Sequence, residues 1–190
     1  MTFDERPLII TDLETTGLDG REHEVIELAA LSVNQQTLTI ENILNIKMRP
    51  THIENADPMS LELNGYSEFE WDVDAKTQNE GWDDYFAFAR NGIFCSYSVS
   101  FDWDFVKQGI RDHWSGSDRR YGPFERHLID IPSIAWGILG PQRSISKNPV
   151  AQTLGFLSEG KPHTALAGAR HAWQILRVLR ERAKGVDHGR

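Results

Sequence analysis

The sequence predicts an α/β fold: a mixed five-stranded sheet whose first three strands are antiparallel and whose helices cover both faces. Two observations indicate this class. Three apolar or alternating segments follow one another early in the chain, separated by short polar loops, which is typical of antiparallel strands. The rest of the chain alternates helical and strand-like segments, which adds α–β–α units to the same sheet.

We expect one domain over residues 1–184, followed by a C-terminal tail over 185–190. The 190 residues are enough to bury one sizeable core. No internal repeat, linker or second apolar core divides the sequence, so a second domain is not expected.

Three strands are expected before residue 50. The first begins at Leu8 with the apolar run Leu-Ile-Ile, the second covers 24–33 and the third covers 38–48. The polar loop 19–23 and the turn 34–36 are short enough for hairpins, so we expect consecutive strands to pair antiparallel.

The middle of the chain, residues 51–81, is polar, acidic and poorly periodic. Within it, Asp57 and Pro58 provide the N-cap and the first turn of a short helix. Asn64 and Gly65 end this helix, because both tolerate the left-handed backbone of a C-terminal cap.

The second half adds further helices and strands. Asp130 precedes Pro132, and we interpret it as the N-cap of the helix that follows rather than as a site residue. The expected helices cover 80–90, 102–114, 149–156 and 164–184, and the expected strands cover 93–99 and 124–130.

Composition places the chain among globular proteins, with 39% hydrophobic and 25% charged residues. The single cysteine, Cys95, excludes a disulfide framework or a cysteine-based zinc cluster and favours a reducing, cytoplasmic location. The N-terminus lacks the basic and apolar regions of a signal peptide. No apolar run approaches the ~18 residues of a membrane span, so no membrane contact is expected.

The net charge of −8 is unevenly distributed. Residues 1–95 carry −13, whereas residues 96–190 carry +5. A polyanion would therefore approach the second half more readily. A solvated surface with chance asymmetry accounts for the same numbers.

Two carboxylates, Asp12 and Glu14, follow the first apolar run one residue apart. Side chains at i and i+2 of an extended chain point to the same face, so these like charges should converge at the strand end. A divalent cation such as Mg²⁺ or Mn²⁺ would relieve their repulsion, because these ions prefer hard oxygen ligands. Gly17, in the turn that follows, permits close approach of another molecule to the backbone. An acidic strand end with a capping turn is the simpler alternative.

A third carboxylate, Asp102, follows the predicted strand 93–99 at a strand-to-helix junction. In open α/β sheets the carboxyl ends of adjacent strands form the crevice where ligands bind. If this strand neighbours the first one, Asp102 faces Asp12 and Glu14.

His163 lies on a loop shaped by glycine and proline, just before the last helix. A histidine in this place can turn toward a bound molecule and accept a proton. A capping or surface role also explains a lone histidine there, and we interpret the other six histidines as surface residues.

Three segments together resemble one known family: Thr-Asp-Leu-Glu-Thr-Thr-Gly-Leu at 11–18, Ser-Val-Ser-Phe-Asp-Trp-Asp-Phe at 98–105 and Pro-His-Thr-Ala-Leu at 162–166. In this order they look like the three motifs of the DEDD-type 3′–5′ exonucleases of the histidine subtype. That family includes polymerase proofreading subunits and oligoribonuclease. Residues 55–66 also resemble bacterial members. The resemblance covers nearly the whole chain and implies a ribonuclease H-like fold, in agreement with the mixed sheet.

The resemblance assigns catalytic roles to four residues. It implies that Asp12, Glu14 and Asp102 hold two Mg²⁺ or Mn²⁺ ions, about 4 Å apart, which lower the pKa of the attacking water and stabilise the attacking and leaving oxygens. It also implies that His163 is the general base that removes the proton of the water.

The implied activity is metal-dependent 3′–5′ hydrolysis of phosphodiester bonds at single-stranded DNA or RNA 3′ ends, with release of nucleoside monophosphates. The resemblance places the first motif against the terminal nucleotide and its base. The expected substrate-binding residues are Thr15, Thr16, Gly17, Leu18, Tyr97 and Ser98. The sequence identifies no protein partner.

Two departures from the family pattern affect this expectation. The family usually has a fourth carboxylate five residues after the histidine, where this chain has Gly168, and no acidic residue lies between Lys161 and Arg180. The family also often has His-Asn where this chain has Tyr97 and Ser98. The missing carboxylate predicts a weakened second metal ion, with fewer negative charges to hold it. We expect an aspartate placed at 168 to point toward the cleft and add the missing ligand.

Two alternatives follow from the same residues. One is a catalytically impaired relative that binds nucleic acid or a partner protein, which Gly168 favours and the intact Asp12, Glu14, Asp102 and His163 disfavour. The other is a phosphatase of the Asp-x-Asp-x-Thr kind. It fits less well, because position 14 is Glu and no lysine follows in a suitable loop.

Overall fold

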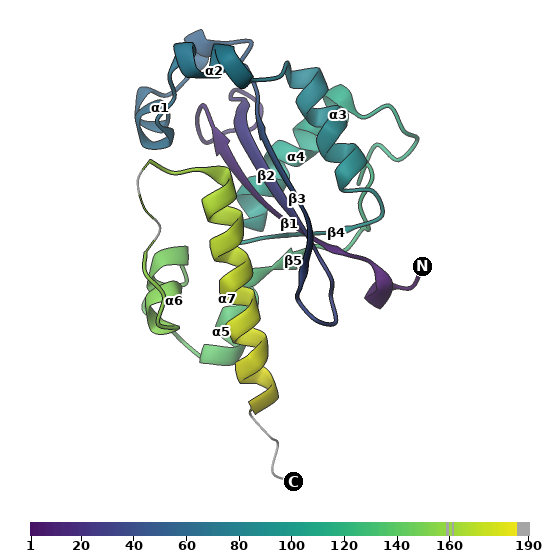
Figure 1. The fold of residues 1–190 in the computed structure, drawn as a ribbon, viewed down its shortest axis with the longest axis vertical. Helices are drawn as coiled ribbons and strands as arrows, with labels where there is room; N and C mark the ends of the chain where they lie inside the picture. The colour runs from purple at the N-terminus through teal and green to yellow at the C-terminus, as the bar shows by residue number, and fades with distance from the viewer. Residues whose placement is uncertain (159, 161, 186–190) are drawn as a thin grey trace.

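The sheet is the centre of the computed structural model, which describes residues 1–158, 160 and 162–185. The described residues form five strands in the order β3-β2-β1-β4-β5 (Figure 1). β1 and β3 each pair antiparallel with β2, whereas β4 pairs parallel with β1 and with β5. The predicted mixed sheet and the adjacency of the first and fourth strands are confirmed. The strands are β1 (Leu8–Thr15), β2 (Val25–Val33), β3 (Ile40–Lys47), β4 (Ile93–Ser96) and β5 (Ile129–Asp130).

Helices pack on both faces of this sheet, as predicted. Figure 1 shows α7 in front of the sheet and α4 behind it. Two short 3-10 turns, Phe3–Glu5 and Ile53–Asn55, complete the secondary structure of the described residues. The helices are α1 (Pro58–Asn64), α2 (Glu68–Asp74), α3 (Gln78–Phe88), α4 (Val99–His113), α5 (Ile131–Leu139), α6 (Lys147–Thr153) and α7 (Ala165–Gly185).

The alternation of β1 divides the core in two. Leu8 and Ile10 pack with residues of α5, α6 and α7, whereas Ile9 and Leu13 pack with residues of α3 and α4. Side chains of alternate residues on a strand point to opposite faces. Asp12 and Glu14 therefore continue the face that carries Ile10, and this is the face that α7 covers.

The end of β4 differs from the prediction. The fourth strand was expected over 93–99, but it stops at Ser96, and α4 begins at Val99. The carbonyl oxygen of Ser98 accepts hydrogen bonds from the backbone N–H groups of Phe101 and Asp102, both at 2.9 Å, so the helix is already formed there. Asp102 consequently lies in the first turn of α4 instead of before it.

The fifth strand is shorter than predicted, because only Ile129–Asp130 of the expected 124–130 pairs with β4. Phe124 instead lies in a turn, where its N–H donates to the carbonyl of Tyr121 at 3.1 Å. Asp130 caps α5 by accepting a hydrogen bond from the N–H of Ser133 at 3.0 Å, as expected.

Residues 68–74 form α2, which the acidic and poorly periodic sequence did not predict. Trp71 explains the helix, since its ring is buried and its Nε1 donates to the carbonyl of Ile26 at 3.0 Å. The other helix bounds shift by one to three residues. Gly185, which was expected in the tail, ends α7, and the rest of that tail lies outside the described residues.

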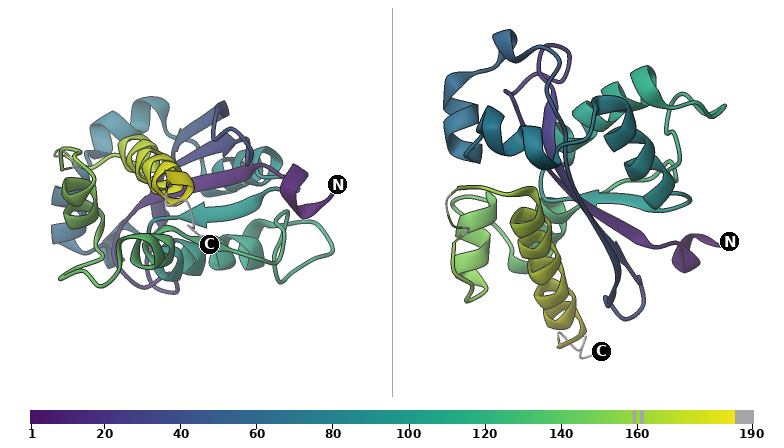
Figure 2. Two further views of the ribbon diagram at one scale, coloured as in Figure 1. Left: turned by 90° about the horizontal axis from the view of Figure 1, so that it is seen from below. Right: turned by 45° about the horizontal axis from the view of Figure 1, so that its top comes forward.

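Figure 2 shows α1 and α2 beside the N-terminal end of α7, at the edge of the sheet where β1 ends. Three segments that are far apart in the sequence therefore meet at this edge: the end of β1, α1 and the start of α7. Among the described residues, no helix combines the length and the apolar character that crossing a membrane requires.

Candidate active site

β1 delivers Asp12 and Glu14 to the same side of the sheet. Both side chains are buried, and their strand pairs with β2 at Ala29 and Glu27, respectively. Glu27 accepts a hydrogen bond from the backbone N–H of Ala165, the first residue of α7. Burial raises the pKa of Glu27, and this hydrogen bond acts in the opposite direction. Glu27 thus fixes the start of the last helix beside the two carboxylates, a role that sequence analysis missed.

Asp102 reaches the same place from the first turn of α4. Its carboxylate is buried and accepts hydrogen bonds from the Ser96 side chain and the Ser98 backbone. Burial, followed by the nearby negative charge of Asp12, raises the pKa of Asp102 well above its usual range, and Lys147 and the hydrogen bonds partly oppose this. A nearby positive charge would stabilise the ionised form of a buried carboxylate that lies beside another carboxylate.

A pocket of about 390 Å³ connects these side chains, and we call it the carboxylate pocket. It brings together the four residues that were expected to be catalytic, including His163 from the segment before α7. Its lining residues are Asp12, Leu13, Glu14, Tyr97, Ser98, Phe101, Asp102, Ser146, Lys147, Asn148, Pro149 and His163.

α1 holds the first motif and the histidine segment together. The Asn64 side chain donates to the carbonyl of Thr15 at 3.0 Å, and the N–H of Asp57 donates to the carbonyl of Thr16 at 2.7 Å. Next to Asn64, the carbonyl of Leu63 accepts a hydrogen bond from the N–H of His163 at 3.1 Å. The position of His163 therefore depends on a helix that is distant from it in the sequence.

Lys147 is the residue that sequence analysis most clearly missed. Its Nζ lies 2.9 Å from Oδ1 of Asp12, with side-chain exposures of 20% and 12%, respectively. No lysine follows the first motif in a suitable loop, because Lys147 comes 135 residues after Asp12 and lies at the start of α6. The packing of α6 against α7 and the core brings the two together.

Gly168 lies directly against Asp12. A Cβ atom at position 168 would be 2.0 Å from Oδ2 of Asp12 and 2.5 Å from its Cγ. Carbon and oxygen atoms in contact are about 3.5 Å apart, so any side chain here requires Asp12 to move. An aspartate at 168 would therefore have to displace the carboxylate of Asp12, which is the end of a side chain, and the expectation that it adds a ligand stays a prediction. The position is on the cleft, but it has no room for a side chain while Asp12 keeps its place.

The threonine hydroxyls at the end of β1 form hydrogen bonds within the chain. Thr15 and Thr16 are buried; the Thr15 hydroxyl donates to the carbonyl of Gly17 at 2.6 Å, and the Thr16 hydroxyl accepts from the N–H of Glu24 at 2.9 Å. The ring of His23 approaches Gly17 so closely that a Cβ there would lie 2.1 Å from its Cδ2. The close neighbour that Gly17 allows is thus a residue of this chain. A substrate contact by these three residues stays a prediction.

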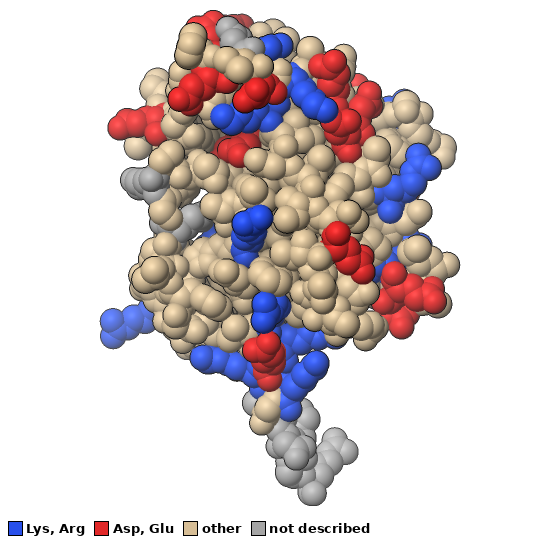
Figure 3. All heavy atoms as spheres, in the orientation of Figure 1, with Lys and Arg blue, Asp and Glu red and all other residues tan. Residues whose placement is uncertain are grey.

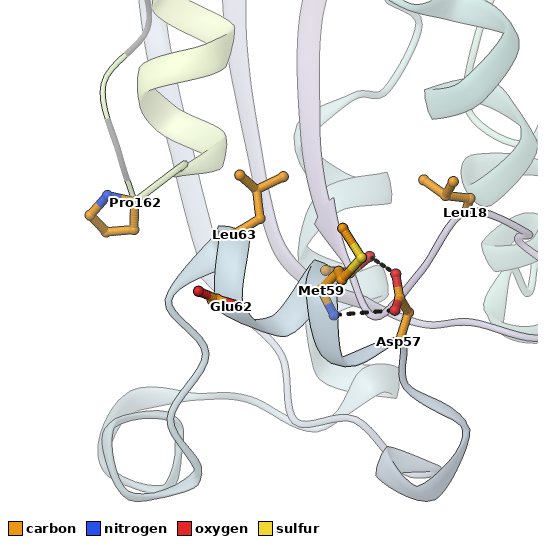
Figure 4. A pocket seen from close by; sticks show the side chains of 7 residues that line it. Leu18, Asp57, Met59, Glu62, Leu63 and Pro162 are labelled. Carbon is orange, nitrogen blue, oxygen red and sulfur yellow. Dashed lines mark hydrogen bonds between the residues drawn. The ribbon is translucent and has the colours of Figure 1, made fainter.

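Leu18 faces a second cavity, of about 670 Å³, which we call the apolar pocket. Its side chain is 78% exposed, as is that of Met59, and Figure 4 shows Met59 and Leu63 of α1 lying between Leu18 and Pro162. Pro162 precedes His163, so the two pockets meet at this segment. The residues that line the apolar pocket are Leu18, Asp57, Met59, Ser60, Glu62, Leu63 and Pro162.

The hydroxyl of Tyr97 forms a hydrogen bond within the chain. The Tyr97 hydroxyl donates to the carbonyl of Ile145 at 2.9 Å, and its ring is buried. Burial raises the pKa of Tyr97 to about 12, which is slightly opposed by Lys147. Tyr97 thus fastens the loop before α6 to the end of β4, and both Tyr97 and Ser98 line the carboxylate pocket. A substrate contact by either residue stays a prediction.

The side chains that would bind the expected pair of metal ions are carboxylates. Carboxylate oxygens suit Mg²⁺ and Mn²⁺. Within the described part of the chain, however, no group of three or more His, Cys, Asp and Glu side chains is placed to hold a metal ion. Asp12 is also paired with Lys147, and position 168 lacks a carboxylate. As they lie, these side chains do not form a site for a divalent ion, and the metal site stays a prediction.

The surface charge follows the asymmetry of the sequence. Figure 3 shows acidic side chains over the upper part of the molecule, where α1, α2 and α3 lie, and basic side chains around the lower end of α7. Arg182 and Lys184 belong to the last turn of that helix. The basic half of the chain therefore places much of its charge at the far end of α7 from His163.

Comparison with known proteins identifies the family. Residues 9–176 match the family model RNase_T, described as Exonuclease. The chain is 28% identical over 185 residues to DNA polymerase III PolC-type of Thermotoga petrophila, strain RKU-1, and equally to that of Thermotoga maritima, strain MSB8. In both cases the alignment covers 97% of this chain but only 13% of the relative, so the chain spans a small part of the length of these polymerases.

Solved structures share the fold. The nuclease domain of 3′hExo, a DEDDh family member bound to rAMP, matches with a TM-score of 0.74 and 19% identity, covering 95% of this chain and 94% of that one. Exonuclease I from Methylocaldum szegediense gives 0.77 and 18%, covering 94% and 41%. A zinc-bound E. coli ExoI–ssDNA complex gives 0.79 and 12%, covering 95% and 41%. These likenesses confirm the ribonuclease H-like fold that was expected.

Proposed function

Because the chain belongs to the exonuclease family, we propose that it is a metal-dependent 3′–5′ exonuclease that removes nucleoside monophosphates from single-stranded DNA or RNA 3′ ends. The observation that carries this proposal is the convergence of Asp12, Glu14, Asp102 and His163 on one pocket. They come from a strand, a helix and a loop that are far apart in the sequence.

Each group has a role in this proposal. Asp12, Glu14 and Asp102 would attract a divalent ion, which when bound supplies positive charge and lowers the pKa of a water molecule. His163 takes the proton from the attacking water, and general-base catalysis of this kind contributes about 10²–10⁴-fold to a rate. The phosphodiester lies in the carboxylate pocket.

The apolar pocket supports the proposed binding of a terminal nucleotide. A nucleotide whose phosphate lies at the carboxylates can place its base against Leu18 and Met59, which together expose a large apolar surface. Base stacking and apolar contact of this kind tolerate every base, which suits an enzyme that removes nucleotides one after another.

The test uses single-stranded DNA and RNA of the same sequence, labelled at the 5′ end or at the 3′ end, with Mg²⁺ or Mn²⁺. We expect the 5′ label to show a ladder that shortens from the 3′ end and the 3′ label to appear at once in a mononucleotide. Glu14→Gln should abolish both products, whereas Glu41→Gln, a matched change on the exposed strand β3, should leave them intact. A 3′ label that stays in longer fragments contradicts the proposed polarity.

A second candidate is a relative that has lost hydrolysis but still binds nucleic acid. The ion pair of Lys147 with Asp12 and the absence of a carboxylate at Gly168 favour it. The same assay separates the two: a parent protein that retards labelled DNA or RNA in a binding assay but yields no shortened product with either metal ion is the binding protein.

A further inference from the structure

Two residues connect the apolar pocket with the carboxylate pocket. Leu63 lines the apolar pocket, and its carbonyl oxygen accepts a hydrogen bond from the N–H of His163 at 3.1 Å. Pro162 lines the apolar pocket as well and directly precedes His163, which lines the carboxylate pocket. The backbone of Gly65 lies against Pro162, since a Cβ at 65 would be 3.0 Å from the Cβ of the proline. An occupant of the apolar pocket therefore contacts the residues that hold the backbone of His163.

α1, which carries Leu63, has few contacts of its own with the core. Of its seven residues, all of them described, only Asn64 is buried. A helix of this length is not stable by itself, because helix nucleation is costly and a few hydrogen bonds do not offset it. The position of α1 beside the sheet therefore depends on a small number of interactions, which is typical of segments that open locally.

Asn64 fastens the end of α1 to the end of β1. Its Nδ2 donates to the carbonyl of Thr15 at 3.0 Å, and Thr15 directly follows Glu14 of the carboxylate pocket. The Oδ1 of Asn64 is buried and has no hydrogen-bond partner among the described residues. Burial of a polar atom without a partner is unfavourable, so the side chain stabilises the position of α1 through its nitrogen.

The surface that α1 turns toward the apolar pocket fits a flat apolar group. Leu18 and Met59 are each 78% exposed, and Figure 4 shows Met59 and Leu63 on the same helix. Asp57 and Glu62 also line this pocket, and their charges repel a phosphate, so the base is the part of a nucleotide that fits there. A base gains its contact with Met59 and Leu63 only while α1 is in place. Binding of the base and the docked position of α1 therefore stabilise each other.

We infer that α1 couples the apolar pocket to His163: a nucleobase in the apolar pocket stabilises the docked position of α1, and α1 holds His163 at the carboxylate pocket. Asn64 is the positioning residue of this coupling, because it fixes α1 to β1. The terminal base thus contributes to the rate of cleavage as well as to affinity, and an abasic 3′ end is a poor substrate. The cleavage itself rests on the proposed function, but the coupling of base, α1 and His163 does not.

Hydrogen exchange of the His163 backbone amide, measured by NMR in EDTA, tests the coupling without any cleavage. The ligands are AMP and ribose 5-phosphate, which share the sugar and the phosphate and differ in the base. The proteins are the parent chain, Asn64→Ala and the matched control Asn42→Ala, which changes an exposed asparagine of β3. Circular dichroism establishes that each protein is folded, and Asn64→Leu, which keeps most of the side-chain volume, is measured alongside Asn64→Ala.

In the parent, AMP at about ten times its Kd should slow exchange of the His163 amide about tenfold, because a ligand that binds only the docked state stabilises it by this factor. Ribose 5-phosphate at the same concentration should leave the exchange unchanged. Without ligand, both Asn64 variants should exchange about 2- to 12-fold faster than the parent, as the loss of one hydrogen bond predicts, whereas Asn42→Ala should match it. Absence of AMP binding, AMP binding with unchanged exchange, equal effects of the two ligands, or parent-like exchange in both Asn64 variants would each overturn the inference.

A cleavage assay separates this inference from the proposed function. Two labelled oligonucleotides, one with a base and one with an abasic site at the 3′ end, are compared in single turnover at saturating protein, where differences in affinity no longer affect the rate. We expect slower cleavage of the abasic end. A parent that shows the AMP effect on His163 but cleaves neither oligonucleotide refutes only the proposed function. A parent that cleaves both ends at the same rate refutes only the coupling.

Discussion

The absence of a side chain at Gly168 determines how closely α7 approaches Asp12. In a helix interior, glycine is about 1 kcal/mol less favourable than alanine, so its presence in α7 weakens the helix. The gain is contact, because the backbone at 168 lies where a Cβ would meet the Asp12 carboxylate. The glycine therefore destabilises its own helix but allows α7 to lie close to Asp12.

We predict that Gly168→Ala lowers both Mn²⁺ affinity and the free energy of unfolding. Overpacking costs about 1–3 kcal/mol, which exceeds the gain of about 1 kcal/mol in helix propensity. The control is Gly137→Ala in α5, where a Cβ has nothing within 4 Å and the substitution should stabilise the protein. Urea unfolding and Mn²⁺ titration measure both effects. A Gly168→Ala variant that is as stable as Gly137→Ala and binds Mn²⁺ like the parent contradicts the packing argument.

His163 is the residue whose role depends most on the proposed function. His163→Ala should reduce the single-turnover rate of 3′-end cleavage by about 10²–10⁴-fold, because the attacking water loses its general base. Binding of a labelled oligonucleotide in EDTA should stay within about twofold of the parent, since the carboxylates and the apolar pocket are intact. His127→Ala changes an exposed histidine elsewhere and serves as the control. A His163→Ala enzyme with more than a tenth of the parental rate would falsify the assignment.

At the scale of elements, contacts made by helices outside the three motifs hold the site together. α1 joins the end of β1 to the histidine segment through hydrogen bonds at Asn64, Asp57 and Leu63. α3 and α4 pack on the opposite face of the sheet, where Gly109 brings the helix backbone within contact of the Trp82 ring. The position of α4, and hence of Asp102, depends on this helix pair.

His113 makes the α3–α4 contact sensitive to pH. Its ring stacks on Trp82 with 6.2 Å between the ring centres, and burial lowers its pKa below 6.5, an effect that Asp112 and Asp83 partly oppose. Below pH 6.5 the unfolded chain therefore takes up the proton before the folded protein does. The stabilisation that comes from the neutral ring is full above 6.5 and is lost as the pH falls through the folded-state pKa.

We accordingly predict that His113→Gln flattens the loss of unfolding free energy between pH 7 and pH 5. Urea unfolding at several pH values measures the slope, and NMR titration of the His113 ring in the parent should give a pKa below 6.5. If the ring titrates at or above 6.5, or if the variant keeps the parental slope, another group controls the acid response.

For the whole molecule, the distribution of charge bears on the proposed binding of nucleic acid. The chain has a net charge of −8, and Lys147 is the one Lys or Arg among the described residues that line the two pockets. The basic end of α7 lies away from them (Figure 3). Affinity for a single strand should thus come from the pockets more than from a long basic track.

The salt dependence of oligonucleotide binding tests this distribution of charge. For single strands, the slope of log K against log salt is about −0.7 per neutralised phosphate. We predict a shallow slope of about −1 for a labelled oligonucleotide bound to His163→Ala in EDTA, and a further loss of about 0.7 in magnitude when Lys147→Met is added. Fluorescence anisotropy at several salt concentrations gives both values. A slope steeper than about −4 would indicate an extended basic path across the surface.

The sequence by itself determined the sheet and the ends of several elements, because these depend on local patterns. Apolar runs and short polar loops predicted the antiparallel start, and Asp57 and Gly65 capped α1 as expected; Gly65 has a φ of 65°. The sequence also located Asp12, Glu14, Asp102 and His163, since the three motifs are contiguous stretches. It did not predict α2, because the segment is acidic and poorly periodic and the burial of Trp71 becomes apparent only in the structure.

Tertiary structure alone decided what surrounds those four residues. The Lys147–Asp12 pair spans 135 positions, and the contact of Gly168 with Asp12 depends on where α7 crosses the sheet. No local pattern records such distances, because charge pairing and close packing across a pocket depend on the relative placement of whole elements. The missing carboxylate was visible in the sequence, but the lysine that lies at the same aspartate became visible only once the chain was folded.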